Sequence, residues 1–414
     1  MLFVSSIKRR LTSSLTNSLH STELQSGCRF HTHLVLVSSH LVSADQKDPH
    51  SCLIGATRER CEGRPWVHLT STTTCCLKQI PSTMADDAIN TAAAKFNRDA
   101  IMKELNDKGY SVIPDVLTSE ECDVYIGKYR DWLATFGADE APDQLDSIIR
   151  SYRVGHLEQT WEVRLKAKSV FQTIWQTDKL LSSVDAIAIA EPPEKKSQAF
   201  NTPNTNWFHL DQSAIRVGLH GYQGAVYLEE TSETDYCFRV LVGSHKQYES
   251  FYDRDEAVAK KSDELGYYRL NNNDMAWYQQ HDCYPRKVPV PKGGIVVWDS
   301  RLVHDNCRPE EGRPNKDRWR FVVFVCMTPA RWARKKDMQL KREAYEKLLM
   351  TWHWPSQGIT FKEERHLYLE EEHRIEKLPE VARSHEAKLL AGVEYDFEDG
   401  RPNGPDWEPQ WREL

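Results

Sequence analysis

The stretch from Asn204 to Ser213 constrains this 414-residue chain more than any other; it reads Asn-Thr-Asn-Trp-Phe-His-Leu-Asp-Gln-Ser. Side chains on a β-strand alternate between faces, so His209 and Asp211 should project from the same side. An imidazole nitrogen and a carboxylate oxygen held this way can share one metal ion, as two members of the 2-His-1-carboxylate set that binds Fe(II). The alternative is a strand histidine hydrogen-bonded to a neighbouring acid. The pair therefore needs a third ligand from elsewhere in the chain.

A second block, from Pro291 to Thr328, offers that ligand. Ile295 to Trp298 is a short apolar run after a Gly-Gly turn, which predicts a buried strand that continues to His304 at or just past its end. A polar loop, Asp305 to Lys316, precedes the next apolar strand. In a β-barrel or jelly roll, neighbouring antiparallel strands can bring His304 and an arginine from the start of the next strand to one mouth.

Two arginines compete for that place. Arg318 and Arg320 both come at the start of the predicted strand, and alternation puts both on the same face. A fixed guanidinium at the mouth could bind a substrate carboxylate through two parallel hydrogen bonds. An ordinary salt bridge is the alternative for either one.

Several blocks in the same order carry a resemblance to a known family. They are Leu105–Pro114, Leu117–Cys122, His209–Asp211, Tyr227–Glu230, Phe238–Lys246, Lys292–His304 and Asp317–Arg320. Together they resemble the phytanoyl-CoA dioxygenase family of Fe(II)- and 2-oxoglutarate-dependent oxygenases. The resemblance implies a mainly β fold, a double-stranded β-helix (a cupin-like jelly roll), with flanking helices.

The resemblance also implies roles for individual residues. His209, Asp211 and His304 would bind the metal and carry the catalysis. Aligning Phe321 to Met327 with the family's last core strand selects Arg320 as the partner of the distal carboxylate of 2-oxoglutarate, with Arg318 as the alternative. Other positions similar to the co-substrate pocket of the family, for which core packing is the alternative, are Tyr227, Asn306 and Trp207.

Four details refine the resemblance. The loop between His304 and the arginine is longer than in the family, so the arginine has to be chosen by strand register. Val242-Gly243 replaces the usual Pro-Gly, which changes the rigidity of the turn more than the chemistry. His245, in the Gly-Ser-His turn, is expected to be structural. Asp211 is present, which argues against the related halogenases.

The implied reaction consumes O₂ and 2-oxoglutarate, with ascorbate as a candidate reductant, and gives succinate, CO₂ and a hydroxylated small-molecule or lipid-derived substrate. A protein or nucleic-acid oxygenase and a catalytically inactive cupin-type binding module are the alternatives. A net charge of −7 gives no support for a large nucleic-acid surface. No apolar run reaches 18 residues, so no membrane span is predicted. Coenzyme A does not follow from the family, because one fold hosts many reactions.

The composition divides the chain into three parts. Residues 1–83 are rich in Ser and Thr and predict either a disordered extension or a transit segment. A dioxygenase-like domain is expected over 84–355, with its metal-site core at 200–328, followed by a helical or irregular tail over 356–414. A cytoplasmic protein is expected; a mitochondrial one follows if residues 1–30 are a presequence. The scattered cysteines predict free thiols.

Periodicity and turn signals predict the remaining elements. Helices are expected over 88–105, 118–136, 161–181 and 332–350. Strands are expected over 110–116, 185–190, 221–227 and 237–242, with 284–291 as an edge segment and 249–280 as an insertion. The aromatic cluster Thr351–Pro355 is predicted to be structural.

Overall fold

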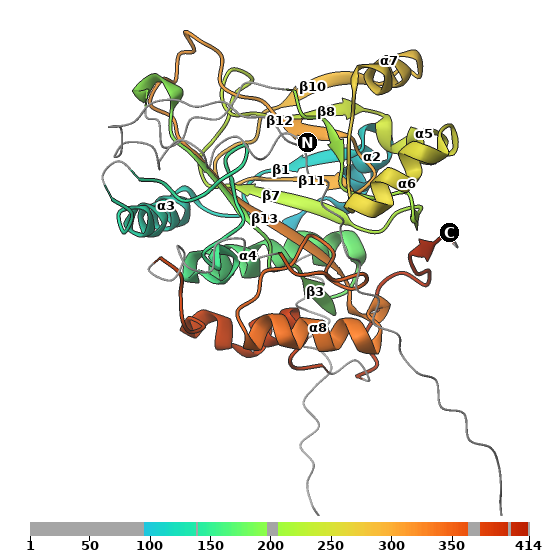
Figure 1. Cartoon of the computed structure of the whole chain (residues 1–414). Coiled ribbons are helices and arrows are strands. Elements are labelled where there is room, and N and C mark those ends of the chain that lie inside the picture. The colour runs from blue at the N-terminus through green and yellow to red at the C-terminus, as the bar shows by residue number, and fades with distance from the viewer. Residues whose placement is uncertain (1–94, 138–139, 197–205, 363–372, 396–398, 413–414) are drawn as a thin grey trace, which may run out of the picture. The chain divides into compact units, whose positions relative to one another are not determined.

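Two antiparallel sheets carry the fold (Figure 1). The computed structural model describes residues 95–137, 140–196, 206–362, 373–395 and 399–412, so the predicted extension over 1–83 and the first residues of the predicted helix 88–105 lie outside it. The larger sheet has the order β1 (Tyr110–Ile113), β11 (Ile295–Asp299), β7 (Tyr222–Tyr227), β13 (Arg320–Pro329), β4 (Ile187–Ala190) and β2 (Ile148–Ile149), and β3 (Leu180–Ser182) also pairs with β13.

The smaller sheet carries the site. Its order is β10 (Tyr284–Val288), β8 (Phe238–Val242), β12 (His304–Asn306), β5 (His209–Leu210) and β9 (Tyr268–Arg269). The predicted edge segment is confirmed, since β10 lies at the end of the smaller sheet and, among the described residues, pairs with β8 alone. The fold class is the expected one: a sheet-rich jelly roll with flanking helices.

Alternation along the central strands separates two cores. On β11, Val296 and Trp298 point toward the smaller sheet, where they pack with Phe238 and Val240 of β8. Their neighbours Ile295 and Val297 point the other way, into a core shared with the helices. Both faces of β11 are therefore buried, which explains why its sequence is a continuous apolar run.

Three helices cover the outer face of the larger sheet. They are α2 (Arg98–Lys108), α3 (Ser119–Leu133) and α4 (Glu158–Trp175). Figure 1 shows α4 running beneath β7 and β13. Thr118 accepts a hydrogen bond from the Glu121 backbone N–H while the Glu121 side chain accepts one from Thr118, a capping box that fixes the start of α3 as predicted.

Other helical boundaries differ from the prediction. The helix expected over 161–181 ends at Trp175, because Gln176 adopts a left-handed conformation (φ 52°) and the chain continues as strand β3. The helix expected over 332–350 is shorter and forms α8 (Lys335–Glu346). Hydrophobic periodicity predicts that both helices exist, but it does not predict the residue at which each helix ends.

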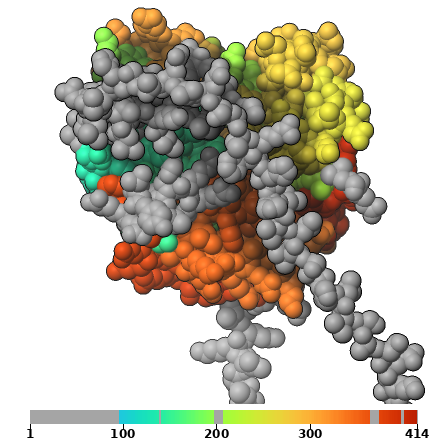
Figure 2. All heavy atoms as spheres, viewed as in Figure 1, coloured from blue at the N-terminus to red at the C-terminus, as the bar shows by residue number. Residues whose placement is uncertain are grey.

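The predicted insertion forms a helical layer over the smaller sheet. It contains α5 (Tyr248–Asp253), α6 (Glu256–Leu265) and α7 (Asn272–Gln280), and Figure 2 shows it as a yellow lobe at the upper right. Phe251 and Tyr278 stack at 4.9 Å in its core. This aromatic packing attaches the insertion to the back of the strand that carries His209.

The C-terminal tail docks on the domain. The next element after α9 (His385–Ala391) is β14 (Gln410–Trp411), which pairs with β6 (Arg216–Val217). The Arg216 guanidinium lies 3.8 Å from the Trp354 ring centroid and 4.4 Å from that of Trp411. These contacts hold the tail by cation–π stacking.

Two smaller predictions can be checked. The five cysteines of the described ranges are free thiols, four buried and Cys307 half-buried, as expected. Among the described residues, no helix has the length and apolar character needed to cross a membrane.

Candidate metal centre and active site

His209, Asp211 and His304 converge as the sequence predicted. Each offers one ligand atom, and these atoms all lie within 4.8 Å of one another. The two histidines are direct partners across β5 and β12, which places their rings on the same face with centroids 4.4 Å apart. Asp211 follows β5 and sits between them, 3.4 Å from each Nε2.

His304 reaches this place by a different route from the one predicted. The strand expected to run from Ile295 to His304 ends at Asp299, where the Leu302 N–H donates to the Asp299 carbonyl and closes a turn. The Asp299 carboxylate also accepts from the backbone and side chain of Arg301. His304 therefore opens β12 in the opposite sheet.

Backbone carbonyls select the histidine tautomers. Nδ1 of His209 lies 3.2 Å from the Trp207 carbonyl oxygen, and Nδ1 of His304 lies 2.9 Å from that of Leu302. A carbonyl only accepts, so each Nδ1 carries the proton and each Nε2 is left to bind a metal. Both rings are thus held in the ligating form by the main chain.

Charge at the centre favours an ionised carboxylate. Burial opposes ionisation, but the neighbouring imidazoles of His353 and His209 hold the pKa of Asp211 well below its usual value. Burial likewise opposes protonation of His209, yet the Asp211 carboxylate raises the pKa of that imidazole. Ligand atoms about 2.1 Å from one ion are roughly 3 to 3.5 Å apart, so the observed separations fit one bound metal.

The three ligands line a cavity with an empty volume of about 690 Å³, its open mouth included. Its apolar walls come from both sheets: Phe238 of β8 from the smaller sheet, and Trp298 of β11 and Phe324 of β13 from the larger sheet. A space of this size is in the range that holds a small ligand.

Arg320 also lines this cavity. It opens β13, its side chain is buried, and it has no carboxylate partner among the described residues. It donates to Ser147 Oγ and interacts with the Tyr227 hydroxyl, while its Nε has no hydrogen-bond partner. Burial lowers the pKa of Arg320. A buried guanidinium with an unused donor fits the carboxylate of a bound acid.

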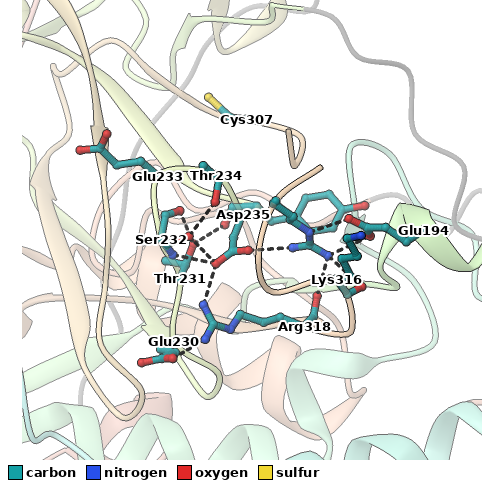
Figure 3. Close-up of polar contacts among 12 residues, drawn as sticks. Glu194, Glu230, Thr231, Ser232, Glu233, Thr234, Asp235, Cys307, Lys316 and Arg318 are labelled. Carbon is teal, nitrogen blue, oxygen red and sulfur yellow. Dashed lines mark hydrogen bonds and ion pairs between the residues drawn. The ribbon is translucent and has the colours of Figure 1, made fainter. Parts of the chain in front are cut away.

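Arg318 does not share the strand face predicted for it. It lies before β13 and is bound elsewhere, with Nη1 2.7 Å from Asp235 Oδ2 and Nη2 paired with Glu230 (Figure 3). Asp235 also accepts from Arg313, which in turn pairs with Glu194. This network, Glu194–Asp235–Arg313–Arg318, anchors the long loop after His304 and accounts for the Arg318 charge.

The remaining predicted residues fall into two groups. Asn306 and Trp207 line the cavity, and the Trp207 ring stacks on His209 at 4.9 Å, so Trp207 is a wall of the site rather than core. Trp207 Nε1 donates to the Asn306 carbonyl at 3.1 Å. Tyr227 is buried outside the main cavity, against Arg320, so it can act on a bound acid only through that arginine.

Sequence reasoning missed part of the cavity. Trp352 and His353, placed in a structural aromatic cluster by prediction, line it together with Lys362 and Arg150. His353 Nε2 lies 4.0 Å from Asp211 Oδ1. Nothing in the spacing of Trp-His-Trp marks a site; the only signal was a histidine inside an aromatic run.

A family model and a curated protein match this chain. The family model described as phytanoyl-CoA dioxygenase matches residues 105–306. A protein of Aspergillus versicolor, described as Ava biosynthesis cluster protein O, is 27% identical over 275 residues, which is 62% of this chain and 86% of that protein.

Solved structures are more distant. The α-ketoglutarate-dependent carbocyclase SnoK from nogalamycin biosynthesis aligns at 17% identity and a TM-score of 0.41, covering 57% of this chain and 86% of SnoK. EctD from S. alaskensis aligns at 14% identity and a TM-score of 0.36, covering 59% of this chain and 79% of EctD.

Proposed function

We propose that this protein is an Fe(II)- and 2-oxoglutarate-dependent oxygenase that hydroxylates a C–H bond of a small molecule; the match of residues 105–306 to the phytanoyl-CoA dioxygenase family model supports this. The observation that carries the proposal is the convergence of His209, Asp211 and His304, with both histidines held in the ligating tautomer.

Different residues would bind the metal and the 2-oxoglutarate. His209, Asp211 and His304 would hold the iron and leave its other positions free. Arg320, oriented by Ser147, would pair with the distal carboxylate of 2-oxoglutarate and so fix its keto acid end toward the metal.

When bound, iron and 2-oxoglutarate supply the activation of O₂, in which 2-oxoglutarate becomes succinate and CO₂ and the substrate C–H becomes C–OH. The protein would position the reactants and provide a largely apolar cavity around them. Phe238, Trp298 and Phe324 line the cavity with apolar surface, which would limit the access of water to the reacting groups. A small-molecule substrate is favoured by the cavity volume and by the description of the Aspergillus versicolor relative as a biosynthesis cluster protein.

The test uses the full chain, loaded anaerobically with Fe(II) and 2-oxoglutarate. We expect a visible metal-to-ligand absorption band and, on exposure to air, slow formation of succinate without added substrate. His209→Ala should lose both signals because one of three ligands is gone.

An exposed histidine provides the matched control. His281→Ala changes an exposed side chain at the end of α7 that does not line the cavity, so this variant should keep the band and the succinate. Absence of the band in the wild-type protein at saturating Fe(II) and 2-oxoglutarate would contradict the proposal and leave a binding module.

A further inference from the structure

A segment beyond the family domain closes the cavity. The domain match ends at residue 306, yet Trp352, His353 and Lys362 line the space around the triad. The segment is firmly attached: Thr351 exchanges backbone and side-chain hydrogen bonds with Val184, and Lys362 pairs with the buried Asp185. It is therefore a fixed wall of the site.

His353 presents an unused nitrogen to the cavity. Its side chain is 14% exposed, and its Nε2 is buried with no hydrogen-bond partner among the residues that the structure describes. At 4.0 Å from Asp211 Oδ1 the nitrogen is too far for a direct hydrogen bond. Nor does His353 belong to the group whose ligand atoms lie within 4.8 Å of one another. A buried polar atom of this kind normally has a partner, so an oxygen of a bound molecule is expected there.

Arg150 presents an unused charge. It follows β2, lines the cavity and lies 5.3 Å from the Trp352 ring centroid. Lys362 lies over the same ring at 4.6 Å, but its charge is neutralised by Asp185. Arg150 forms no ion pair with any carboxylate in the part of the chain that the structure describes.

The charges lining the cavity can be matched one by one. Lys362 pairs with Asp185, and Asp305 pairs with Arg239. With the proposed cofactors bound, the metal is balanced by Asp211 and one carboxylate of 2-oxoglutarate, and Arg320 by the other. A single positive charge, that of Arg150, remains.

We propose, on the basis of the function above, that the substrate is a small monoanion that also carries a hydrogen-bonding oxygen. Its acidic group pairs with Arg150, and its hydroxyl or carbonyl oxygen binds His353 Nε2 close to the metal. Substrate choice then depends on two places together: Arg150 inside the family match and His353 in the 351–362 wall beyond it.

The test uses the full chain with Mn(II) and 2-oxoglutarate, because Mn(II) enhances the NMR relaxation of molecules bound beside it without turnover. The probes are benzoate, 3-hydroxybenzoate and cyclohexanecarboxylate, each compared with its carboxamide. We expect enhanced relaxation for the acids over the amides, strongest for 3-hydroxybenzoate. Arg150→Gln should weaken binding of the acids about tenfold or more, since it removes a charge-assisted pair.

Further variants separate the roles. Arg150→Lys should retain part of the preference for acids, which excludes a mere loss of folding, and His353→Phe should remove the advantage of the hydroxylated acid. Arg342→Gln, on the exposed side of α8, should behave like the wild type.

Three results would overturn the inference: equal relaxation of acids and amides, no relaxation of any acid, or unchanged binding in Arg150→Gln. The signals of 2-oxoglutarate report on the proposed function separately. If Mn(II) does not relax 2-oxoglutarate in the wild-type protein, the proposed function itself is wrong; if it does and the acids fail, only the substrate assignment is wrong.

Discussion

The guanidinium groups of Arg313 and Arg320 are both buried, but they differ in what balances their charge. Arg313 pairs with Glu194 and Asp235, whereas Arg320 contacts hydroxyl groups and has no carboxylate among the described residues. An unbalanced buried charge costs several kcal/mol unless a ligand supplies the partner. We therefore expect Arg313 to stabilise the fold and Arg320 to bind an acidic ligand.

A matched pair of variants tests this difference. Arg320→Gln should raise the KM for 2-oxoglutarate about 10- to 100-fold, since it removes a two-point charge-assisted contact. Arg318→Gln, two residues away, should leave that KM unchanged because Asp235 and Glu230 already hold its charge. Steady-state succinate assays measure both; an equal effect of the two changes would contradict the assignment.

Individual site residues could be predicted from the sequence where the chemistry allows only a few residue types. His209, Asp211 and His304 could be predicted, because strand alternation and a short set of ligand residues restrict the choice. The sequence could not tell which of Arg318 and Arg320 faces the cavity. The difference comes from a tertiary contact: Arg318 pairs with Asp235 and lies before β13, whereas Arg320 is the first residue of that strand. His353 had no local signal at all, since its place beside Asp211 is a tertiary contact.

Among the elements, β7 tolerates little change at its centre. A methyl group at Gly224 would lie 2.9 Å from Ile295 Cδ1, 3.0 Å from the Val325 carbonyl oxygen and 3.2 Å from the Phe171 ring. Gly224→Ala should therefore lower the free energy of unfolding by about 1–3 kcal/mol, because the backbone oxygen cannot move aside.

The control lies in a helix. At Gly127, inside α3, an added methyl group meets no atom within 4 Å. Gly127→Ala should raise the free energy of unfolding by about 0.5–1 kcal/mol, as alanine favours the helix. Chemical denaturation of both variants measures the difference, and a neutral Gly224→Ala would show that β7 and α4 can separate.

Element types were better predicted than their ends. The buried strands β7, β8 and β11 read as apolar runs bounded by turn signals, and the Thr118–Glu121 capping box set the start of α3 correctly. The end of β11 at Asp299 depends on a turn held by Arg301. Hydrophobic periodicity indicates the type of an element but carries no information on side-chain contacts of this kind, so it does not predict where the strand ends.

Stability of the whole molecule should depend on pH through a buried histidine. Burial lowers the pKa of His156 from 6.5 to about 3, and the ring donates from Nε2 to the Leu349 carbonyl. The unfolded chain therefore takes up a proton on this histidine below about pH 6.5, whereas the folded chain does so only near pH 3. The contribution of neutral His156 to the free energy of unfolding is fully present above pH 6.5 and is lost as the pH falls toward 3.

The comparison with His156→Gln isolates this contribution. Between pH 6.5 and pH 5 the wild-type protein should lose about 1.5 kcal/mol more of its free energy of unfolding than the variant loses. Urea denaturation at each pH measures it, and the other titrating groups cancel because both proteins share them. Parallel pH profiles would contradict a neutral, buried His156.

The central position of β13 affects how the chain is made. β13 pairs with β7 on one side and with β4 on the other, but it is the last strand of the larger sheet to be synthesised. The 130 positions from Ala190 to Arg320 take on the order of ten seconds to translate. During that time β4 and β7 each expose an unpaired edge, the kind of surface that recruits other strands. We therefore expect fragments that stop before residue 329 to be insoluble, because both edges stay unpaired in them.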